Sequence, residues 1–439
     1  MRQAVILCGG KGTRLGSDFS HLPKPLVPVA GVPLLDHILG RVAEAGISQV
    51  WLAAGHLGHL IAERYAAGNP WGLAIQTHIE GQPLGTAGCL LELEDRLDEA
   101  FALLYGDVFL DFSLGALLQA HAAAGPDATV LVRQSDHPAD SDLVDWDELT
   151  GEVRAFLPKA TRPAGGLYRN WGNAAVYACG KRMLAAIPRG RSSDIATDVF
   201  PALLAAGGRI RAHPLEERGY VKDMGTPARL VEVERYWARR QRARAGAAAP
   251  RRIRGVLLDR DGVLVENREP LGTVEELALL PGALAGLAAM EEAGLRCLVA
   301  TNQPWIARGL LSEAQLAAVH QALRALVEAG GGKLWDFAYS PYHPETHHGE
   351  GVLELRRASE CRKPRPGMLF ALMERHGLDP AETVMVGDSR ADIVAGQNAG
   401  LRTILIGDEP TALAAGPTAV AGDLQEAAQI IFSWNSNHQ

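Results

Sequence analysis

Two aspartates separated by one residue, Asp259 and Asp261, follow a short apolar run and precede Gly262. The apolar run, residues 255–258, predicts a buried strand that ends at the acids. Two carboxylates this close repel each other unless a cation lies between them, so the pattern favours Mg²⁺ and an anionic substrate. Such a strand normally opens an α/β domain, yet more than half of the chain precedes it. The sequence therefore predicts a second domain that begins here.

Further along the chain, three features add groups that phosphoryl transfer needs. One apolar run leads into Thr301, a later loop carries Lys363, and another apolar run ends at Asp388, with Asp392 one helical turn on. Because parallel strands end at the same edge of a sheet, we expect these groups to converge on one crevice. A purely structural aspartate cluster around one metal ion is the alternative interpretation.

The residue types suggest a mechanism for this second site. Asp259 would attack phosphorus and form an aspartyl-phosphate, and Asp261 would protonate the leaving alcohol and later activate water. Thr301 and Lys363 would hold the transferring phosphoryl group. Mg²⁺ would bind Asp259, the carbonyl of Asp261 and Asp388, which shields the phosphate from the carboxylates it must approach.

A glycine-rich loop after the N-terminal strand could bind a polyphosphate. Glycines let backbone N–H groups approach phosphates closely, and Lys11 and Arg14 add positive charge. The spacing matches neither the dinucleotide fingerprint nor the P-loop, and a plain glycine-rich turn is the alternative. Lys24 follows between two prolines in a stiff, extended segment. The loop residues expected to contact the nucleotide are Cys8, Gly9, Gly10, Gly12 and Thr13.

Strand-like and helix-like segments alternate after this loop, which predicts βαβ units and a mostly parallel sheet. Gly85 and Thr86 lie in a second glycine loop that opens a predicted helix, and a strand-like run ends at Asp107. Ligands in such sheets bind beyond the carboxyl ends of the strands. We therefore expect Asp107 to face the first glycine loop, and Gly85 and Thr86 to bind the nucleotide.

The order of these motifs resembles the sugar-1-phosphate nucleotidyltransferases over residues 1–240: Gly-Gly-x-Gly-Thr-Arg-Leu, Pro-Lys-Pro, Gly-Thr-Ala-Gly and Gly-Asp. The resemblance implies that a sugar-1-phosphate oxygen attacks the α-phosphate of an NTP and expels pyrophosphate. It also implies a sugar contact by Asn173, and Mg²⁺ between Asp107 and Asp223.

On the same resemblance, Arg14 and Lys24 would offset the charge that grows in the transition state. One position departs from the family pattern. Pro158 stands before Lys159, where a glutamate usually precedes the lysine. Sugar recognition could therefore differ from the family norm.

Residues 252–410 resemble the haloacid-dehalogenase-like phosphatases, and among them the histidinol-phosphate and heptose-bisphosphate phosphatases. The motifs that carry this resemblance are Asp-Arg-Asp-Gly, Thr-Asn-Gln and Cys-Arg-Lys-Pro-Arg-Pro-Gly-Met. From the resemblance we expect Asn302, Gln303 and Arg362 to contact the substrate.

Those relatives carry a zinc loop of the pattern Cys-x-His…Cys-x-Cys. The corresponding positions here are Ser340, Tyr342, Ser359 and Cys361. One ligand of four survives, and structural zinc needs about four soft ligands, so zinc is not expected. In the alternative, nearby histidines rebuild a metal site with the remaining cysteine: His343, His347 and His348.

Composition is consistent with a soluble enzyme of two or three domains. The chain has 439 residues, 47% of them hydrophobic and 21% charged, and a net charge of −8, which argues against a dedicated nucleic-acid binder. Its five cysteines are scattered, as suits reduced thiols in the cytoplasm. Neither a signal peptide nor a membrane-spanning run is evident, so no membrane partner is expected.

The predicted fold class is α/β, with two three-layer αβα domains and mostly parallel sheets. A Rossmann-like nucleotidyltransferase would be followed by a haloacid-dehalogenase-like phosphatase. The predicted boundaries are 1–240 for the first domain, 241–254 for a basic linker, 255–432 for the second domain and 433–439 for a tail. Residues 238–254 contain seven arginines and no apolar stripe, which predicts a helix end and an exposed linker. A nucleic-acid-binding arm is the alternative.

The two chemistries fit together as one bifunctional enzyme. The phosphatase half would convert a bisphosphate of the heptose 1,7-bisphosphate type to the 1-phosphate, which the transferase half would join to a nucleotide, with GTP favoured. The Pro-Leu-Gly-Thr-Ala-Gly segment resembles that of heptose-1-phosphate guanylyltransferases. One alternative keeps both chemistries on another sugar or polyol with CTP or another NTP. In another, one half is a silent binding module. The expected partners are an NTP and a sugar phosphate, and the chain could form a homo-oligomer.

Overall fold

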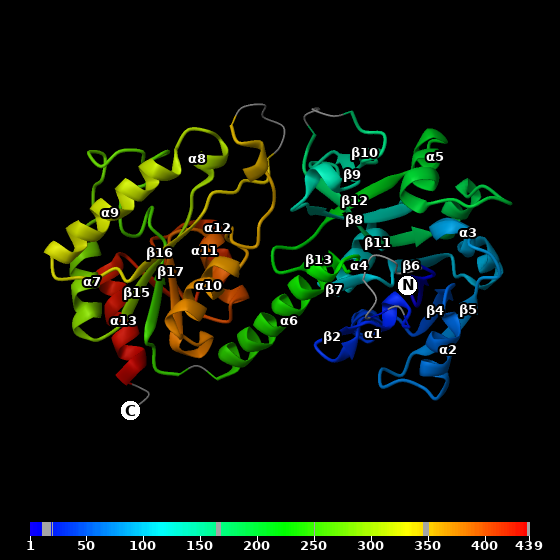
Figure 1. Ribbon diagram of the computed structural model, residues 1–439, viewed down its shortest axis with the longest axis horizontal. Helices are drawn as coiled ribbons and strands as arrows, with labels where there is room; N and C mark the ends of the chain where they lie inside the picture. The colour runs from blue at the N-terminus through cyan, green and yellow to red at the C-terminus, as the bar shows by residue number, and fades with distance from the viewer. Residues whose placement is uncertain (11–18, 20, 164–167, 250, 346–350, 437–439) are drawn as a thin grey trace. The chain divides into compact units, whose positions relative to one another are not determined.

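The computed structural model describes residues 1–10, 19, 21–163, 168–249, 251–345 and 351–436. The chain divides into two compact units, Met1–Tyr236 and Trp237–Gln439. Both have helices around a central sheet (Figure 1). Within the described ranges, no helix is both long and apolar enough to cross a membrane.

The first unit contains a nine-stranded sheet with β1 near its centre. Strands β4, β5 and β6 continue the parallel part of the sheet that contains β1, and β11 adds to β6 in the antiparallel direction. The parallel strands are β1 (Gln3–Cys8), β4 (Gln49–Ala54), β5 (Ala74–Ile79) and β6 (Ala100–Tyr105). The others in this sheet are β8 (Ala128–Gln134), β9 (Leu143–Trp146), β10 (Val153–Leu157), β11 (Trp171–Gly180) and β12 (Ile210–Pro214).

Helices cover both faces of this first sheet. Val5 of β1 lies in a core with residues of α3 and α5, while its neighbours Ala4 and Ile6 are buried toward the opposite face. Side chains alternate between the faces of a strand, so burial of successive residues indicates a sheet covered on both sides. The helices are α1 (Leu34–Glu44), α2 (Gly58–Ala66), α3 (Gly85–Glu92), α4 (Leu114–Ala124) and α5 (Phe200–Ala205). Helix α6 (Pro227–Ala248) begins in this unit and continues beyond its last residue, Tyr236. A separate ribbon pairs β7 (Val108–Asp111) with β13 (Tyr220–Asp223), and β2 (Pro28–Val29) pairs with β3 (Val32–Pro33).

The second unit is built on a six-stranded sheet in the order β16-β15-β14-β17-β18-β19, in which every pairing is parallel. Its strands are β14 (Gly255–Leu258), β15 (Arg296–Asn302), β16 (Asp336–Ser340), β17 (Thr383–Gly387), β18 (Arg402–Ile406) and β19 (Ala419–Ala421). The chain reverses direction across the sheet at β14, so β15 and β17 flank it. This is the switch point at which open α/β sheets place their ligands.

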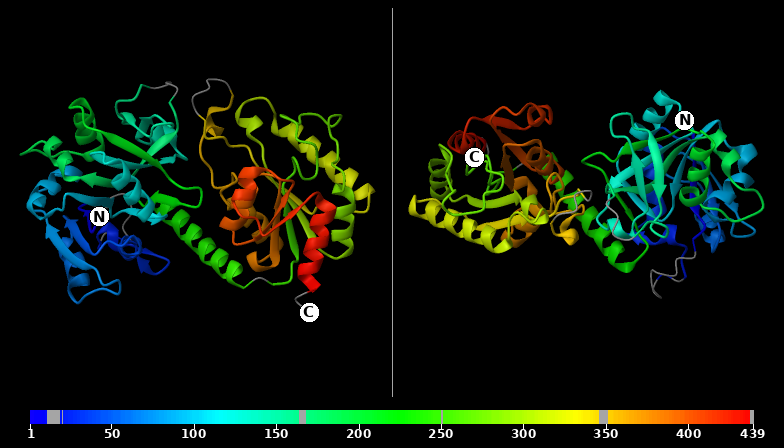
Figure 2. Two further views of the ribbon diagram at one scale, coloured as in Figure 1. Left: turned by 180° about the vertical axis from the view of Figure 1, so that it is seen from behind. Right: turned by 90° about the horizontal axis from the view of Figure 1, so that it is seen from above.

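Two cores separate the second unit into three layers. Val256 and Leu258 of β14 pack with α7, α9 and α13, whereas Leu257 between them packs with α10 and α11. The helices are α7 (Ala283–Glu292), α8 (Pro304–Ala307), α9 (Glu313–Ala329), α10 (Gly367–His376), α11 (Arg390–Asn398), α12 (Pro410–Ala414) and α13 (Leu424–Ser436). The two helical layers lie on opposite sides of this sheet in Figure 1 and in the view from behind in Figure 2. The predicted α/β class with three layers is confirmed.

The segment predicted to be an exposed linker, residues 241–254, differs from that prediction in its first part. Helix α6 continues to Ala248, and Ala243 is buried in the second unit's core beside α10. A Cβ on Gly246 would lie 2.7 Å from the Cβ of Pro380, so the backbone itself packs closely there. Because the residues that pack here are alanine and glycine, the sequence shows no stripe of large apolar residues. The segment therefore resembles an exposed linker.

Two candidate active sites

The first candidate site begins where β1 ends. Cys8 is buried, and Gly9 and Gly10 follow it as exposed residues. The backbone N–H of Gly106, just after β6, donates to the carbonyl of Leu7 at 2.9 Å, so the ends of β1 and β6 lie side by side. The expected loop residues Lys11, Gly12, Thr13 and Arg14 lie outside the described residues. Phosphate binding by this loop therefore stays a prediction.

Beyond β6, the structure brings together Lys24 and the two aspartates that we predicted to bind metal. Lys24 Nζ lies 3.1 Å from Asp107 Oδ2. Strand β13 ends at Asp223 and pairs with β7, which begins one residue after Asp107, and the Met224 N–H donates to the Asp107 carbonyl at 2.9 Å. Arg229 contacts the Asp223 carboxylate. Two partly exposed carboxylates at one end of this ribbon are hard oxygen ligands of the kind that Mg²⁺ prefers.

The second glycine loop is held by the segment before α5. Gly85 has φ +78°, and a Cβ there would lie 2.3 Å from the Ser193 carbonyl oxygen, so only glycine fits. The Thr86 hydroxyl donates to Asp194 Oδ2 at 2.7 Å and accepts from the Ile195 N–H at 3.0 Å. Thr86 therefore fixes the start of α3, while Gly85 is exposed at that start. Nucleotide contacts by these two residues stay predictions.

The predicted sugar-binding residue Asn173 lies where β11 bulges away from β8. Its Nδ2 donates to the Tyr177 hydroxyl at 2.9 Å, and its Oδ1 accepts from the Ala175 N–H at 3.0 Å. Ala175 has φ +57°, a left-handed conformation that costs an alanine about 1 kcal/mol. The departure noted at Pro158 lies nearby in sequence, where Lys159 forms an exposed ion pair with Asp140 at 2.7 Å.

The second candidate site is centred on Lys363, whose side chain is buried among acids. Its Nζ lies 2.9 Å from Asp259 Oδ1, 2.5 Å from Asp392 Oδ1 and 2.7 Å from the Ala300 carbonyl oxygen. The Asp259 Oδ1 also accepts from the Arg260 backbone N–H at 2.8 Å. Both contacts from described residues thus reach Oδ1 and leave Oδ2 as the oxygen that could attack phosphorus.

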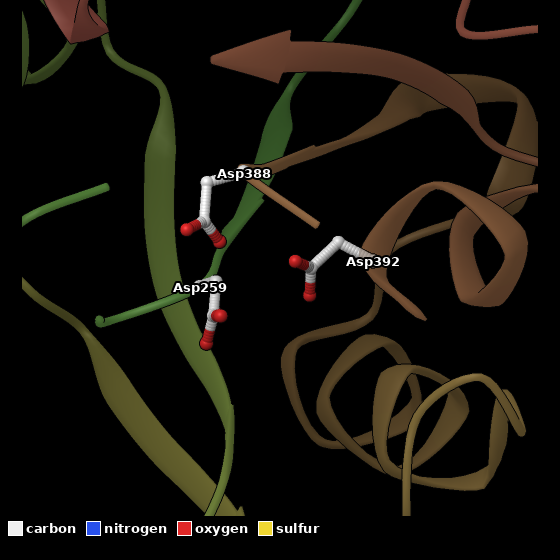
Figure 3. A group of neighbouring side chains, drawn as sticks. All are labelled: Asp259, Asp388 and Asp392. Carbon is white, nitrogen blue, oxygen red and sulfur yellow. The ribbon is translucent and has the colours of Figure 1, made fainter. Parts of the chain in front are cut away.

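Three carboxylates gather at this site, from the ends of β14 and β17 and the start of α11 (Figure 3). Asp259, Asp388 and Asp392 each offer an oxygen within 4.8 Å of the others. Burial raises the pKa of Asp259 to about 8, and burial together with Asp392 raises the pKa of Asp388 to about 6. One lysine balances three acids, so the donor set fits a hard cation such as Mg²⁺. Gly262 has φ +78°, and a Cβ there would lie 2.0 Å from Asp388 Oδ2.

Asp261, the predicted acid and base, is bound by neighbouring donors. Gln303 Nε2 donates to Asp261 Oδ2 at 2.9 Å and to the Thr301 hydroxyl at 2.9 Å. The Arg260 guanidinium contacts both carboxylate oxygens of Asp261. Thr301 and Gln303 are almost fully buried. The structure therefore places Thr301 beside the predicted acid and makes Gln303 a link between them.

The predicted substrate contacts Asn302 and Arg362 have partners within the protein. Asn302 Nδ2 donates to the Lys363 carbonyl at 3.0 Å, and the Lys363 N–H donates to Asn302 Oδ1 at 3.1 Å, so the amide clamps the backbone of Lys363. Arg362 Nη1 donates to the Tyr342 carbonyl at 3.1 Å. Burial, with Arg308 nearby, lowers the pKa of Arg362 to about 10. Substrate contact by Asn302, Gln303 and Arg362 stays a prediction.

Three of the four positions compared above with a zinc loop, Ser340, Ser359 and Cys361, lie together. Cys361 Sγ is 3.1 Å from the Ser359 hydroxyl and 3.5 Å from the Ser340 hydroxyl. Tyr342 packs under the Arg357 guanidinium at 4.4 Å. His343 accepts a hydrogen bond from the Glu345 N–H at 3.2 Å. In the described part of the chain neither Cys361 nor His343 belongs to a group of three metal-ligating side chains. His347 and His348 lie outside the described residues.

Sequence reasoning did not assign roles to Asp392 and Arg260. Asp392 is fully buried and binds Lys363 through Oδ1, while its Oδ2 accepts from Ser389 at the start of α11. Its spacing of four residues from Asp388 indicated that the two acids share a face, but spacing cannot predict contact with Lys363, which lies 29 residues upstream. Arg260 lies between the two predicted catalytic acids in the sequence, and its chain position alone does not show which one it binds.

Comparisons with known proteins agree with this division. Residues 3–240 match the Nucleotidyl transferase family, and residues 360–427 match the HAD-hydrolase-like family. The mannose-1-phosphate guanylyltransferase of Mycobacterium tuberculosis is 36% identical over 264 residues, which cover 60% of this chain and 71% of that protein. The D-glycero-β-D-manno-heptose-1,7-bisphosphate 7-phosphatase of Rhodopseudomonas palustris is 36% identical over 156 residues, which cover 35% of this chain and 83% of that protein.

Among solved structures, HddC from Yersinia pseudotuberculosis aligns with 54% of this chain and 100% of its own at 22% identity, with a TM-score of 0.46. The predicted fusion of a nucleotidyltransferase with a haloacid-dehalogenase-like phosphatase is confirmed by the family matches and the two similar enzymes. The chain is an enzyme that belongs to the nucleotidyl transferase family and carries a haloacid-dehalogenase-like phosphatase domain as its second half.

Proposed function

We propose that the protein is a bifunctional enzyme of nucleotide-sugar biosynthesis that acts on a heptose. The second unit removes one phosphate from a sugar bisphosphate of the heptose 1,7-bisphosphate type. The first unit then transfers a nucleotidyl group from an NTP, with GTP favoured, to the sugar 1-phosphate and releases pyrophosphate. The observation that carries this proposal is that one chain holds two strand-end sites, each with a lysine and acids able to handle phosphate. A cytoplasmic location, where the NTP is available, belongs to the proposal.

In the phosphatase reaction, Asp259 Oδ2 forms a bond to phosphorus as the bond from phosphorus to the sugar oxygen breaks. Asp261 gives its proton to that oxygen, so the sugar leaves as an alcohol. Water then attacks the phosphorus of the aspartyl-phosphate, the bond from phosphorus to Asp259 Oδ2 breaks, and phosphate leaves. The attacking water gives a proton to Asp261, which restores both acids. Lys363, 2.9 Å from Asp259, and Thr301, hydrogen-bonded to Gln303, would hold the phosphoryl oxygens. Mg²⁺, held by Asp259, Asp388 and the Asp261 carbonyl, would supply positive charge beside the phosphate.

In the transferase reaction, an oxygen of the sugar 1-phosphate attacks the α-phosphate of the NTP, and pyrophosphate leaves. Lys24, paired with Asp107 at the end of β6, would offset the charge that grows on the reacting phosphates. Asp107 and Asp223 would hold Mg²⁺, which would supply charge that gathers the two anionic substrates. Asn173 at the β11 bulge would contact the sugar.

The choice of substrates rests on the names of similar proteins. The guanylyltransferase relative supports a guanine nucleotide, and the bisphosphate 7-phosphatase relative supports a heptose and an order in which the second unit acts first. The alternative keeps both reactions on another phosphorylated sugar or polyol with another NTP. Two features support this alternative: Pro158 in place of the usual glutamate, and the altered zinc-loop positions.

A ³¹P NMR experiment on the whole enzyme separates these substrates. The enzyme is incubated with Mg²⁺, a heptose 1,7-bisphosphate and each NTP in turn. The proposal predicts the signal of free phosphate, then paired diphosphate signals of a nucleotide-sugar with GTP, accompanied by pyrophosphate. A product with CTP only, or no phosphate release from the heptose but release from another sugar bisphosphate, would favour the alternative.

A further inference from the structure

Arg260 lies between the two acids of the second site and turns its side chain onto one of them. Its Nε donates to Asp261 Oδ1 at 3.0 Å, and its Nη2 lies 2.9 Å from both Asp261 Oδ1 and Oδ2. The arginine side chain is only 1% exposed. A guanidinium that contacts both oxygens of a carboxylate fixes the plane of the carboxylate as well as its distance.

Arg260 is itself held from behind. Its Nη1 lies 3.3 Å from His320 Nε2 on α9, and the His320 ring stacks on Phe337 of β16 with centroids 4.6 Å apart. Burial, with Arg260 and Arg324 nearby, lowers the pKa of His320 to about 3, so the imidazole is neutral and accepts the hydrogen bond. Gln303, which is also buried, donates to the same Asp261 carboxylate. The acid is therefore held from two directions by groups that are themselves fixed.

The same residue reaches the nucleophile through its backbone. The Arg260 N–H donates to Asp259 Oδ1 at 2.8 Å, while its side chain binds Asp261. One residue thus sets the positions of both reacting carboxylates relative to each other. A misplacement of about 1 Å in such a pair can cost roughly 100-fold in rate.

We propose that Arg260, backed by His320, is a positioning residue that orients Asp261 for proton transfer to the leaving oxygen of the substrate. The inference rests on the proposed function, in which Asp261 is the general acid. The proton passes from Asp261 to the sugar oxygen as the bond between phosphorus and that oxygen breaks. Arg260 exchanges no proton and touches no substrate atom.

This role predicts a dependence on the leaving group that a merely structural role does not. An alkyl oxygen, as in a sugar phosphate, leaves poorly without a proton, whereas p-nitrophenolate leaves without one. In Arg260→Lys, which keeps the charge but loses the planar fork, the rate of the first step, in which the leaving oxygen departs, should fall about 100-fold for the sugar bisphosphate, within the usual range of general acid catalysis. With p-nitrophenyl phosphate the rate of the same step, read as the burst of p-nitrophenol in the first turnover, should fall less than about threefold. Hydrolysis of the aspartyl-phosphate, in which Asp261 accepts a proton, is common to both substrates and is not part of the comparison.

The test uses the full chain with Mg²⁺ and two reference variants. Arg324→Gln removes a different arginine, which lies 5.2 Å from the centroid of the Phe337 ring and touches neither acid. This variant should leave the rates on both substrates unchanged. Asp261→Asn should show the same selectivity for the leaving group as Arg260→Lys, and more strongly. Urea unfolding of the second unit shows whether each variant is folded.

Equal losses in the first-step rate on both substrates in Arg260→Lys, or no loss on either, would overturn the proposal. If Asp261→Asn itself shows no selectivity for the leaving group, the general-acid role in the proposed function fails, which is a separate result. Should Arg260→Lys not fold, His320→Gln answers the question, because it loosens the arginine without removing it. It should produce the same selective loss, about three- to tenfold on the sugar bisphosphate, and an equal loss on both substrates would count against the proposal.

Discussion

The two sites use the same residue types in opposite surroundings. In the first unit, Lys24 and Asp107 pair at 3.1 Å with side chains 10% and 33% exposed. In the second unit, Lys363 lies between Asp259 and Asp392, and the three side chains are 1%, 13% and 0% exposed. An ion pair near solvent is worth little to stability, whereas a buried lysine depends on its acids.

In the proposed function, this difference corresponds to two kinds of chemistry. A reaction that passes through a covalent bond to an aspartate needs that aspartate held in place, and Asp259 is held by Lys363 and by the Arg260 N–H. A direct transfer between two bound substrates needs charged groups that large anions can reach. The candidate residues of the second site are therefore part of the core of its unit, while those of the first lie near the surface of theirs.

The largest expected effect tests whether the two sites act independently. Asp259→Asn removes the nucleophile and should lower phosphate release by roughly 10⁴-fold or more. Nucleotidyl transfer from a supplied sugar 1-phosphate should stay within about twofold. Asp107→Asn is the matched variant and should show the reverse pattern. Both rates are measured on the same preparations, and loss of both activities in a folded Asp259→Asn chain would contradict two independent sites.

The next effect concerns stability. Asp392→Asn leaves Lys363 buried with one acid fewer, so it should lower the free energy of unfolding of the second unit by about 3 kcal/mol. Asp107→Asn disrupts a partly exposed pair and should cost less than about 1 kcal/mol in the first unit. Urea unfolding of both variants measures the two values. Equal costs would remove the distinction between a buried and a surface site.

A pH series sharpens the comparison within the second unit. Burial lowers the pKa of His320 from 6.5 to about 3, so the folded state binds its proton less readily than the unfolded state. Above pH 6.5 the histidine is neutral in both the folded and the unfolded state and does not change the stability. The free energy of unfolding falls as the pH drops from 6.5 toward 3, because only the unfolded state takes up the proton. Between pH 7 and pH 4 this group should remove about 3 kcal/mol, a loss that His320→Gln should not show. If the free energy of unfolding changed equally between pH 7 and pH 4 in the two chains, the burial argument would be contradicted.

The smallest effect concerns the first site. Ala175 holds a left-handed conformation at the bulge that carries Asn173, which glycine adopts without strain. Ala175→Gly should stabilise the first unit by about 0.5 kcal/mol, because the relief of strain exceeds the added entropy of the unfolded chain. The melting temperature of the first unit measures this change. A lower melting temperature would mean that the Ala175 methyl group contributes packing that outweighs its strain.

The sequence predicted the residues at strand ends better than their partners. Asp259, Thr301 and Asp388 could be placed together because neighbouring parallel strands end at one edge of a sheet. The contact between Asp392 and Lys363 could not be predicted in this way. It joins a loop to a helix, and how closely these two approach depends on the packed fold. The left-handed Ala175 was likewise hidden, because alanine gives no signal of a strained backbone.

Loop and helix contacts limited the sequence prediction in a similar way. Asn302 and Gln303 were predicted to bind substrate from their place in a motif, and the structure shows them hydrogen-bonded to Lys363 and Asp261. The arginine-rich segment looked like a free linker because its packing residues are small. Motif and spacing thus predicted which residues meet at the second site, while tertiary contacts determine which side chains hold them.

The central claim is that the second unit prepares the substrate of the first, and phosphate release by the Asp107→Asn chain tests it most directly. This chain should no longer consume a sugar 1-phosphate, so the phosphatase reaction can be followed alone. With Mg²⁺ and heptose 1,7-bisphosphate, the account predicts release of one equivalent of phosphate. The matching heptose 1-phosphate should react at least about 100-fold more slowly, because only the distal phosphate reaches Asp259. Comparable release from both compounds would contradict the account, since the second unit would then destroy what the first requires.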